Sequence, residues 1–156
     1  MSASEQIRQN HHRCVPHLAR LRMLAHTPAG APTASRNIRE ITHATNAIMA
    51  EAKAGYRTAL VPAADGSRAS VNPSLLQPRL ARLQAAAEDT VAAASRGDAV
   101  ALHRQVRRFE SLTSAIWAVL LSTVAPPRGR TEASAGPAAG SLLRTKPSLL
   151  RLLRTR

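Results

Sequence analysis

The amino-acid sequence predicts an all-α fold, a small helical bundle built on a long antiparallel helical hairpin. In two consecutive stretches, apolar residues recur at intervals of three and four, which places them on one stripe of an α-helix. A short turn, Ser95-Arg96-Gly97-Asp98, separates the two stretches. Alanine, which favours helix, is abundant, and alternating β-branched runs are few, so the sequence does not favour a sheet.

The two helices of the hairpin are expected over about residues 76–96 and 98–125. Gly97 suits the left-handed conformation that ends many helices, and the Asp98 carboxylate suits the first free N–H groups of the next helix. The expected core positions before the turn are Leu76, Leu80, Leu83, Ala87, Val91 and Ala94. After the turn they are Leu102, Val106, Phe109, Thr113, Ile116, Leu120 and Val124.

A third helix is expected over about residues 36–54, so that residues 35–125 form a helical domain with a core of three helices. Asn37 is a suitable N-cap, with Ser35 as the alternative. Glu40 lies three residues after Asn37, the spacing of a capping box. The apolar stripe of this helix comprises Ile38, Ile41, Thr45, Ile48 and Ala52.

Proline and glycine predict where the other helices are interrupted. Residues 1–34 are expected to be partly mobile and to form two short helices and a linker, because Pro16 is tolerated in the first turn of a helix but disrupts a helix interior. The linker is Thr-Pro-Ala-Gly-Ala-Pro at residues 27–32. Gly55 is the expected end of the third helix, and residues 56–75 are expected to form a loop.

The chain is strongly basic, with a formal charge of +13 carried by 20 arginines and 2 lysines. A charge of this size favours an anionic partner, either nucleic acid or a membrane surface. The alternative is GC-rich coding, which enriches arginine and alanine together. The single cysteine, Cys14, excludes an intrachain disulfide, and no signal peptide opens the chain, so we expect a reducing, cytoplasmic location.

The outer face of the second hairpin helix changes character along its length. Its first half carries Arg104, Arg107 and Arg108, which are candidates for contact with nucleic acid. Its second half carries small uncharged residues at spacings of four, three and four: Ser111, Ala115, Ala118 and Ser122. Small side chains let another helix approach closely, so we expect the helix over residues 36–54 to pack there; a homodimer interface is the alternative.

The C-terminal part of the chain is divided by composition. Residues 126–140 are rich in Pro, Gly, Ser and Ala, which is typical of a flexible linker, and residues 141–156 form a basic amphipathic tail. The candidate phosphate contacts in this tail are Arg144, Lys146, Arg151, Arg154 and Arg156. The leucines between them also suit an anionic membrane surface, a partner groove or the core of the protein itself.

No constellation of residues predicts an enzyme, a metal site or a cofactor. His11, Cys14 and His17 step by three, but a fourth ligand is missing and the expected helix break separates them. Cys14 and His17 also lack a third group to orient them for nucleophilic chemistry. Glu88 and Asp89 are adjacent on a helix, so their side chains diverge by about 100° and do not share an acid–base site.

The sequence therefore predicts a non-enzymatic accessory protein that binds nucleic acid through sequence-independent charge. Its three aromatic residues are too few for a base-stacking platform, which favours contact with a duplex backbone. The first alternative is a helical protein–protein interaction module, including a homodimer, and the second is peripheral association with an anionic membrane. Residues 111–125 are uncharged but shorter than the roughly 20 residues that a membrane-spanning helix needs.

Overall fold

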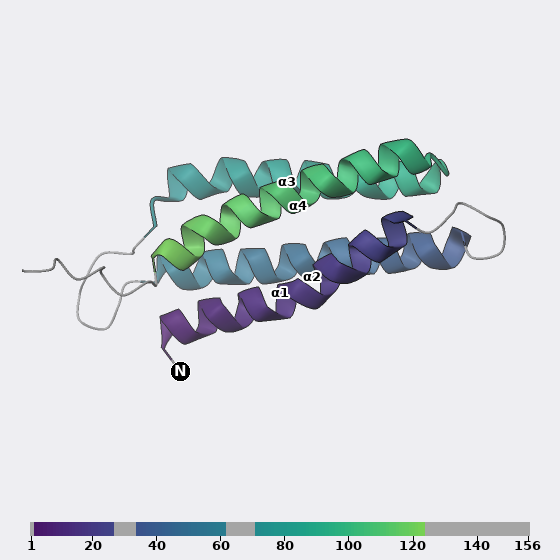
Figure 1. Cartoon of the computed structure of the whole chain (residues 1–156). Coiled ribbons are helices and arrows are strands. Elements are labelled where there is room, and N and C mark those ends of the chain that lie inside the picture. Colours follow the sequence, from purple (N-terminus) through teal and green to yellow (C-terminus); the bar gives the residue numbers. More distant parts are fainter. Residues whose placement is uncertain (1, 27–33, 62–70, 124–156) are drawn as a thin grey trace, which may run out of the picture. The chain divides into compact units, whose positions relative to one another are not determined.

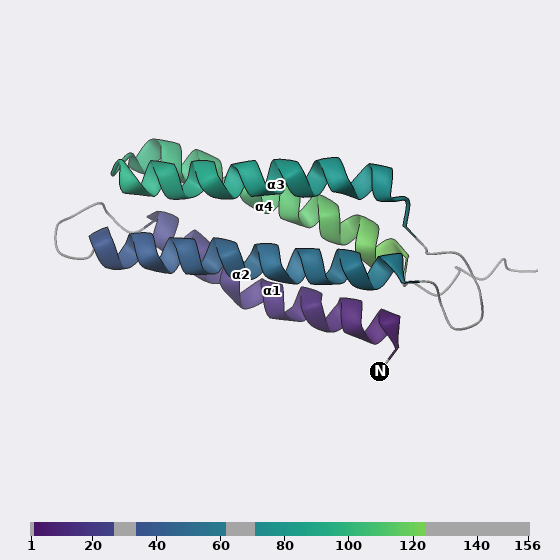
Figure 2. The same ribbon diagram turned by 180° about the vertical axis from the view of Figure 1, so that it is seen from behind.

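The computed structural model describes residues 2–26, 34–61 and 71–123. They form four helices, α1 (Ala3–His26), α2 (Ala34–Leu60), α3 (Pro73–Ser95) and α4 (Ala99–Ser122), packed as an antiparallel bundle. The α1–α2 and α3–α4 hairpins make the most extensive contacts and lie side by side (Figure 1; Figure 2). The all-α fold and the central hairpin are confirmed, but the bundle contains four helices instead of the expected core of three.

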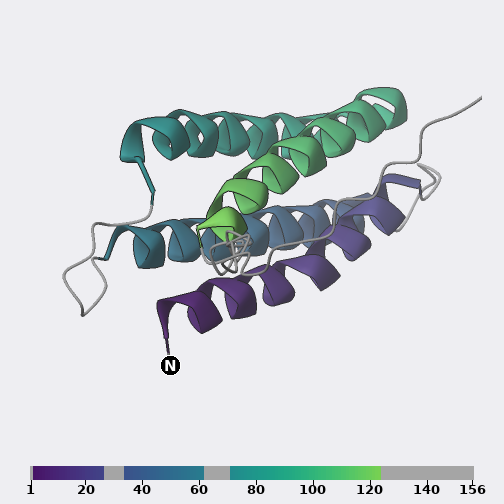
Figure 3. The same cartoon turned by 60° about the vertical axis from the view of Figure 1, so that its left-hand side comes forward.

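The order of the helices around the bundle places α1 between α2 and α4, and α3 on the far side of the core. Viewed from the side, α4 runs between α3 and α1, with α2 behind it (Figure 3). The diagonal pair α2 and α4 makes fewer contacts than the adjacent pairs. None of the helices in the described ranges is long and apolar enough to cross a bilayer.

The expected break at Pro16 is wrong, because α1 continues through this residue as one helix. Pro16 lies on the exposed side of α1, where water can solvate the carbonyl group that loses its hydrogen-bond partner. An interior proline costs about 3 kcal/mol. On the opposite side Ile7, Leu21 and Leu24 are buried, and each such side chain contributes about 1.5–3 kcal/mol. Tertiary burial therefore outweighs the local helix-breaking effect.

The expected start and end of α2 are also wrong. Ser35 and Asn37 lie inside the helix, and the Glu40 carboxylate accepts hydrogen bonds from arginines instead of a cap N–H group. The helix passes through Gly55 and ends at Leu60, so the first residues of the expected loop are helical. The apolar stripe is confirmed, with Ile41, Thr45, Ile48 and Ala52 buried and Ile38 half-buried.

Gly55 is a close-packing position between α2 and α4, near the C-terminal ends of both helices. A Cβ atom built on it lies 3.1 Å from two ring carbons of Trp117 and 3.2 Å from the Cδ1 atom of Leu120. Glycine therefore lets α2 approach α4 across the diagonal of the bundle, and this contact explains why a residue that often ends helices lies inside one.

The α3–α4 hairpin has the turn that the sequence predicts. Gly97 has a φ of 68°, and the Asp98 carboxylate accepts a hydrogen bond from the Ala101 N–H group at 2.9 Å. The Asp98 N–H group donates to the Ala93 carbonyl at 3.2 Å, which ties the turn to the end of α3. The expected core positions are buried except Val91, Ala94 and Leu102, which are half-buried, and Val124, which lies outside the described residues.

Replacing Gly97 with Ala is expected to destabilise the bundle by about 1 kcal/mol, because an L side chain rarely adopts a positive φ. The effect should be purely conformational, since an added Cβ atom meets no neighbour within 4 Å. Thermal unfolding followed by circular dichroism measures it. Gly97→Asn is the matched control and should lose less stability than Gly97→Ala, because Asn tolerates a positive φ. An unchanged or higher melting temperature for Gly97→Ala would show that the turn has another geometry.

Candidate nucleic-acid interface

The outer face of α4 is exposed along its whole length. The seven residues that share this face are all exposed: Arg104, Arg107, Arg108, Ser111, Ala115, Ala118 and Ser122. The opposite face of α4 carries the buried residues that pack against the other helices: Val106, Phe109, Thr113, Ile116, Trp117 and Leu120. Within each set the residues recur every three or four positions, which is the helical period. The sequence therefore places the three arginines on the face of α4 opposite to the buried one.

The expectation that the 36–54 helix covers the small residues of α4 is wrong. α2 packs mainly against α1 and α3, and it reaches α4 from the inside at Gly55. Ala115 and Ala118 are exposed, and one side chain of α3 reaches this region, where Arg79 donates to the Ala115 carbonyl at 3.4 Å. The buried apolar residues on the opposite face of α4 pack against the other helices. The small residues of the outer face are therefore left exposed to solvent.

Two of the three arginines on α4 form no ion pair within the described residues. Arg108 lies 3.4 Å from the Asp89 carboxylate of α3, and both side chains are about half exposed. An ion pair this exposed contributes between about 0 and 1 kcal/mol, so the Arg108 guanidinium is easily redirected to another anion. Arg104 and Arg107 are exposed on the same face.

A groove between α1 and α4 extends this basic surface beyond α4. The rings of His26 and His103 meet edge to face, with centroids 4.8 Å apart. Next to them, Arg22 of α1 forms an ion pair with Glu110 of α4. Arg107 also lines this groove, and its charge is not matched by a second acid among the lining residues. Sequence reasoning missed Arg22 and His26 because it expected α1 to be broken.

A second groove, between α1 and α2, repeats this arrangement on the other side of α1. His17 and His43 meet edge to face, with centroids 5.9 Å apart. Glu40 accepts hydrogen bonds from Arg20 and from Arg36. Hydrogen bonds from Arg20 and then Arg36 hold the pKa of the Glu40 carboxyl below its usual value.

The described residues are basic as a whole, with 14 Lys and Arg side chains against 7 Asp and Glu side chains, a net charge of +7. The other predicted contacts lie outside the described residues: Arg144, Lys146, Arg151, Arg154 and Arg156. The candidate interface that the structure describes therefore consists of the outer face of α4 and the α1–α4 groove beside it.

The His11 ring and the Cys14 thiol, which lie one turn apart on α1, have different surroundings in the structure. The His11 ring packs edge to face on Trp117, with centroids 5.2 Å apart, whereas Cys14 is fully buried. Burial raises the pKa of the Cys14 thiol to about 11, against a smaller opposite effect of Trp117, and Glu51 raises it further. The thiol is therefore protonated at neutral pH and is a poor nucleophile. Within the described ranges, no three His, Cys, Asp or Glu side chains are grouped to hold a metal ion.

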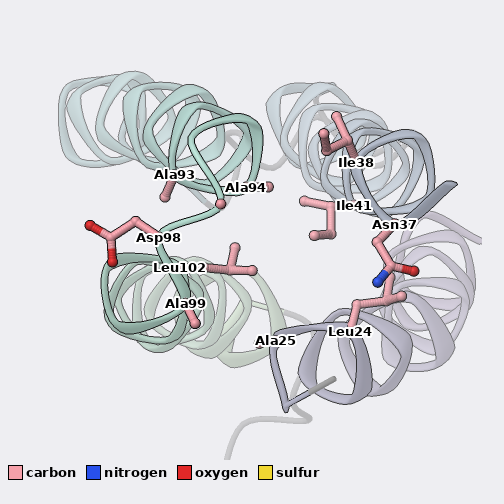
Figure 4. Close-up of a pocket in the computed structure, with 11 residues that line it drawn as sticks. Leu24, Ala25, Asn37, Ile38, Ile41, Ala93, Ala94, Asp98, Ala99 and Leu102 are labelled. Carbon is pink, nitrogen blue, oxygen red and sulfur yellow. The ribbon is translucent and has the colours of Figure 1, made fainter. Parts of the chain in front are cut away.

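An apolar pocket lies at the end of the bundle where α1 ends and α2 begins. Leu24, Ile41 and Leu102 project into it from three helices, and its wall is completed by four alanines together with Asn37, Ile38, Gly97 and Asp98 (Figure 4). Its volume is about 60 Å³, well below the roughly 150 Å³ of a cavity that holds benzene. The short alanine side chains around the α3–α4 turn account for this gap. Its one charged lining residue among those described is Asp98, a carboxylate that caps α4 and does not attract an anion.

Comparison of the chain with protein-family models, with curated protein sequences and with solved structures finds no match.

Proposed function

We propose that the protein binds nucleic acid without sequence preference and without catalysing a reaction, through contacts between arginines and backbone phosphates. The observation that carries this proposal is the row of exposed arginines on α4, two of which form no ion pair within the described residues. A guanidinium presents a planar fork of donors that matches two phosphate oxygens. Such contacts fix a protein on a duplex but do not read its sequence.

The aromatic residues support a duplex as the partner. Phe109 and Trp117 are buried in the core and Tyr56 is half-buried, and these are the three aromatic residues of the chain. Proteins that hold single strands stack the bases on exposed aromatic rings. With its rings in or against the core, this protein is better suited to the phosphates of a double helix, whose bases are already stacked.

Changing Arg104, Arg107 and Arg108 together to Gln is expected to weaken binding to duplex DNA and to reduce its salt dependence. Each phosphate contact contributes about −0.9 to the log–log salt slope, so three lost contacts should make the slope shallower by about 2.7. Fluorescence anisotropy with a labelled duplex at several salt concentrations measures both quantities.

The matched control changes Arg13, Arg57 and Arg82 to Gln. These three residues are exposed and form no ion pair within the described part of the chain, so the control removes the same charge from other faces of the bundle. It should have a clearly smaller effect on affinity. Equal losses in both triple variants would show that the total charge matters and that α4 is not the interface.

The second candidate function is a helical protein–protein interaction module. It is favoured by the small-residue half of the α4 outer face, which no helix of the described structure covers: Ser111, Ala115, Ala118 and Ser122. Light scattering of the full chain distinguishes the two functions. A stable dimer that Ala115→Arg converts to a monomer, together with no binding to DNA at low salt, would favour the interaction module.

A further inference from the structure

We propose that the groove between α1 and α2 is a second anion site, one that takes a phosphate group. Five arginine and histidine side chains from the two helices line this groove: His17, Arg20, Arg36, Arg39 and His43. Glu40 and Ala44 complete its wall. The site is separate from the arginine row of α4, so it does not depend on the proposed function.

The register of the two antiparallel helices builds the groove. His17 and Arg20 lie one turn apart on α1, and Glu40 and His43 lie one turn apart on α2. Because the helices run in opposite directions, His17 meets His43 while Arg20 meets Glu40. Positions 36 and 39 lie one turn earlier on α2, which brings two more guanidinium groups to the same groove.

The charges in the groove do not cancel. One carboxylate, Glu40, is shared by Arg20 and Arg36, whereas Arg39 forms no ion pair within the described residues. With both imidazoles neutral, three arginines and one glutamate leave a net charge of +2 in the groove. This excess suits a phosphate, which carries between one and two negative charges and accepts the bidentate hydrogen bonds that guanidinium groups donate.

The groove is not required to hold the two helices together. The side chains of Arg20 and Arg36 are 49% and 76% exposed, and ion pairs this exposed contribute little to stability. The two helices pack extensively against each other, and both bury apolar residues in the core, including Ile7 and Leu21 of α1 and Ile48 of α2. The arginine side chains can therefore turn towards a ligand while the helices remain packed.

The imidazole rings of His17 and His43 lie in the same groove as the three arginines. Their ring N–H groups are further hydrogen-bond donors for a phosphate.

The probes are inorganic pyrophosphate and a short duplex DNA, which carry the same phosphate chemistry as a free ligand and as a polymer backbone. The full chain is titrated with each probe at pH 6, and the ring signals of the six histidines are followed by NMR. We expect pyrophosphate, duplex DNA or both to shift the signals of His17 and His43. The exposed His12, on another face of α1, should not move with them. Which probe produces the shift identifies the source of the phosphate.

The variant Arg39→Gln removes the guanidinium that forms no ion pair and should weaken binding of the effective probe about tenfold, the usual value of one charged hydrogen bond. Arg57→Gln is the matched control on the same helix and should leave this affinity unchanged. If neither probe shifts His17 and His43, or if both variants weaken binding equally, the site is excluded.

The triple change of Arg104, Arg107 and Arg108 separates this proposal from the previous one. It should reduce binding of duplex DNA and leave the response to pyrophosphate intact. Conversely, Arg39→Gln should weaken pyrophosphate binding even if α4 does not contact DNA. Loss of the pyrophosphate response in the α4 variant would overturn the assignment of a separate site to the α1–α2 groove.

Discussion

The variant Phe109→Ala is expected to lose about 3–5 kcal/mol of unfolding free energy, the usual cost of removing a fully buried phenyl ring. Phe109 is fully buried in the middle of α4 and, with Trp117, is one of two buried aromatic residues in a described core composed mainly of Leu, Ile and Ala. Small alanine side chains cannot collapse into the space that the ring leaves. Because single domains of this size are stable by about 5–15 kcal/mol, the variant should be close to partial unfolding at room temperature.

Urea unfolding followed by circular dichroism measures this loss. Val100→Ala is the matched control on the same helix, because Val100 is 71% exposed and its truncation should change stability by less than about 0.5 kcal/mol. Similar midpoints for the two variants would contradict the burial of the α4 apolar face. A large shift for Phe109→Ala alone would confirm that this face forms the centre of the bundle.

The sequence was sufficient to predict the α3–α4 hairpin because its signals are local. An apolar stripe on each helix, a glycine that ends α3 and an aspartate that caps α4 all lie within the hairpin itself. Local signals did not predict that α1 continues through Pro16 and that α2 continues through Gly55. Proline is accepted in α1 because the other side of the helix is buried, and glycine is required in α2 because Trp117 packs against it.

The same distinction applies to the candidate sites. The helical period alone predicts that Arg104, Arg107 and Arg108 share a face, and the structure places them in solvent. The grooves beside α1 depend on the register between helices that are distant in the sequence. Arg20 and Glu40 form an ion pair because α1 is continuous and antiparallel to α2. A single sequence contains no signal for the register between these two helices.

The second large effect is expected from the C-terminal tail, whose basic residues the sequence predicts to be candidate contacts for nucleic acid. Changing its five basic candidates to Gln should make the log–log salt slope shallower by about 4.5, at about −0.9 per phosphate contact. Over a fourfold range of salt such a slope amounts to a factor of about 500 in affinity. The residues to be changed are Arg144, Lys146, Arg151, Arg154 and Arg156.

The matched control keeps these charges and changes Leu149 and Leu153 to Ser. Binding to DNA should survive this change, because leucines make no phosphate contacts. If the leucine variant loses its partner while the charge variant does not, the tail acts through its apolar face. Vesicles of neutral and anionic lipid then test the membrane alternative, since a basic amphipathic segment should prefer the anionic ones.

The salt dependence of binding by the full chain tests the central claim most directly. Two duplexes of unrelated sequence are titrated with the protein between about 50 and 200 mM salt, the range over which phosphate contacts are strongly screened. We expect both duplexes to bind with the same affinity and with the same steep negative slope, because the contacts are to the backbone. A slope near zero, or no binding at the lowest salt, would contradict a function in nucleic-acid binding.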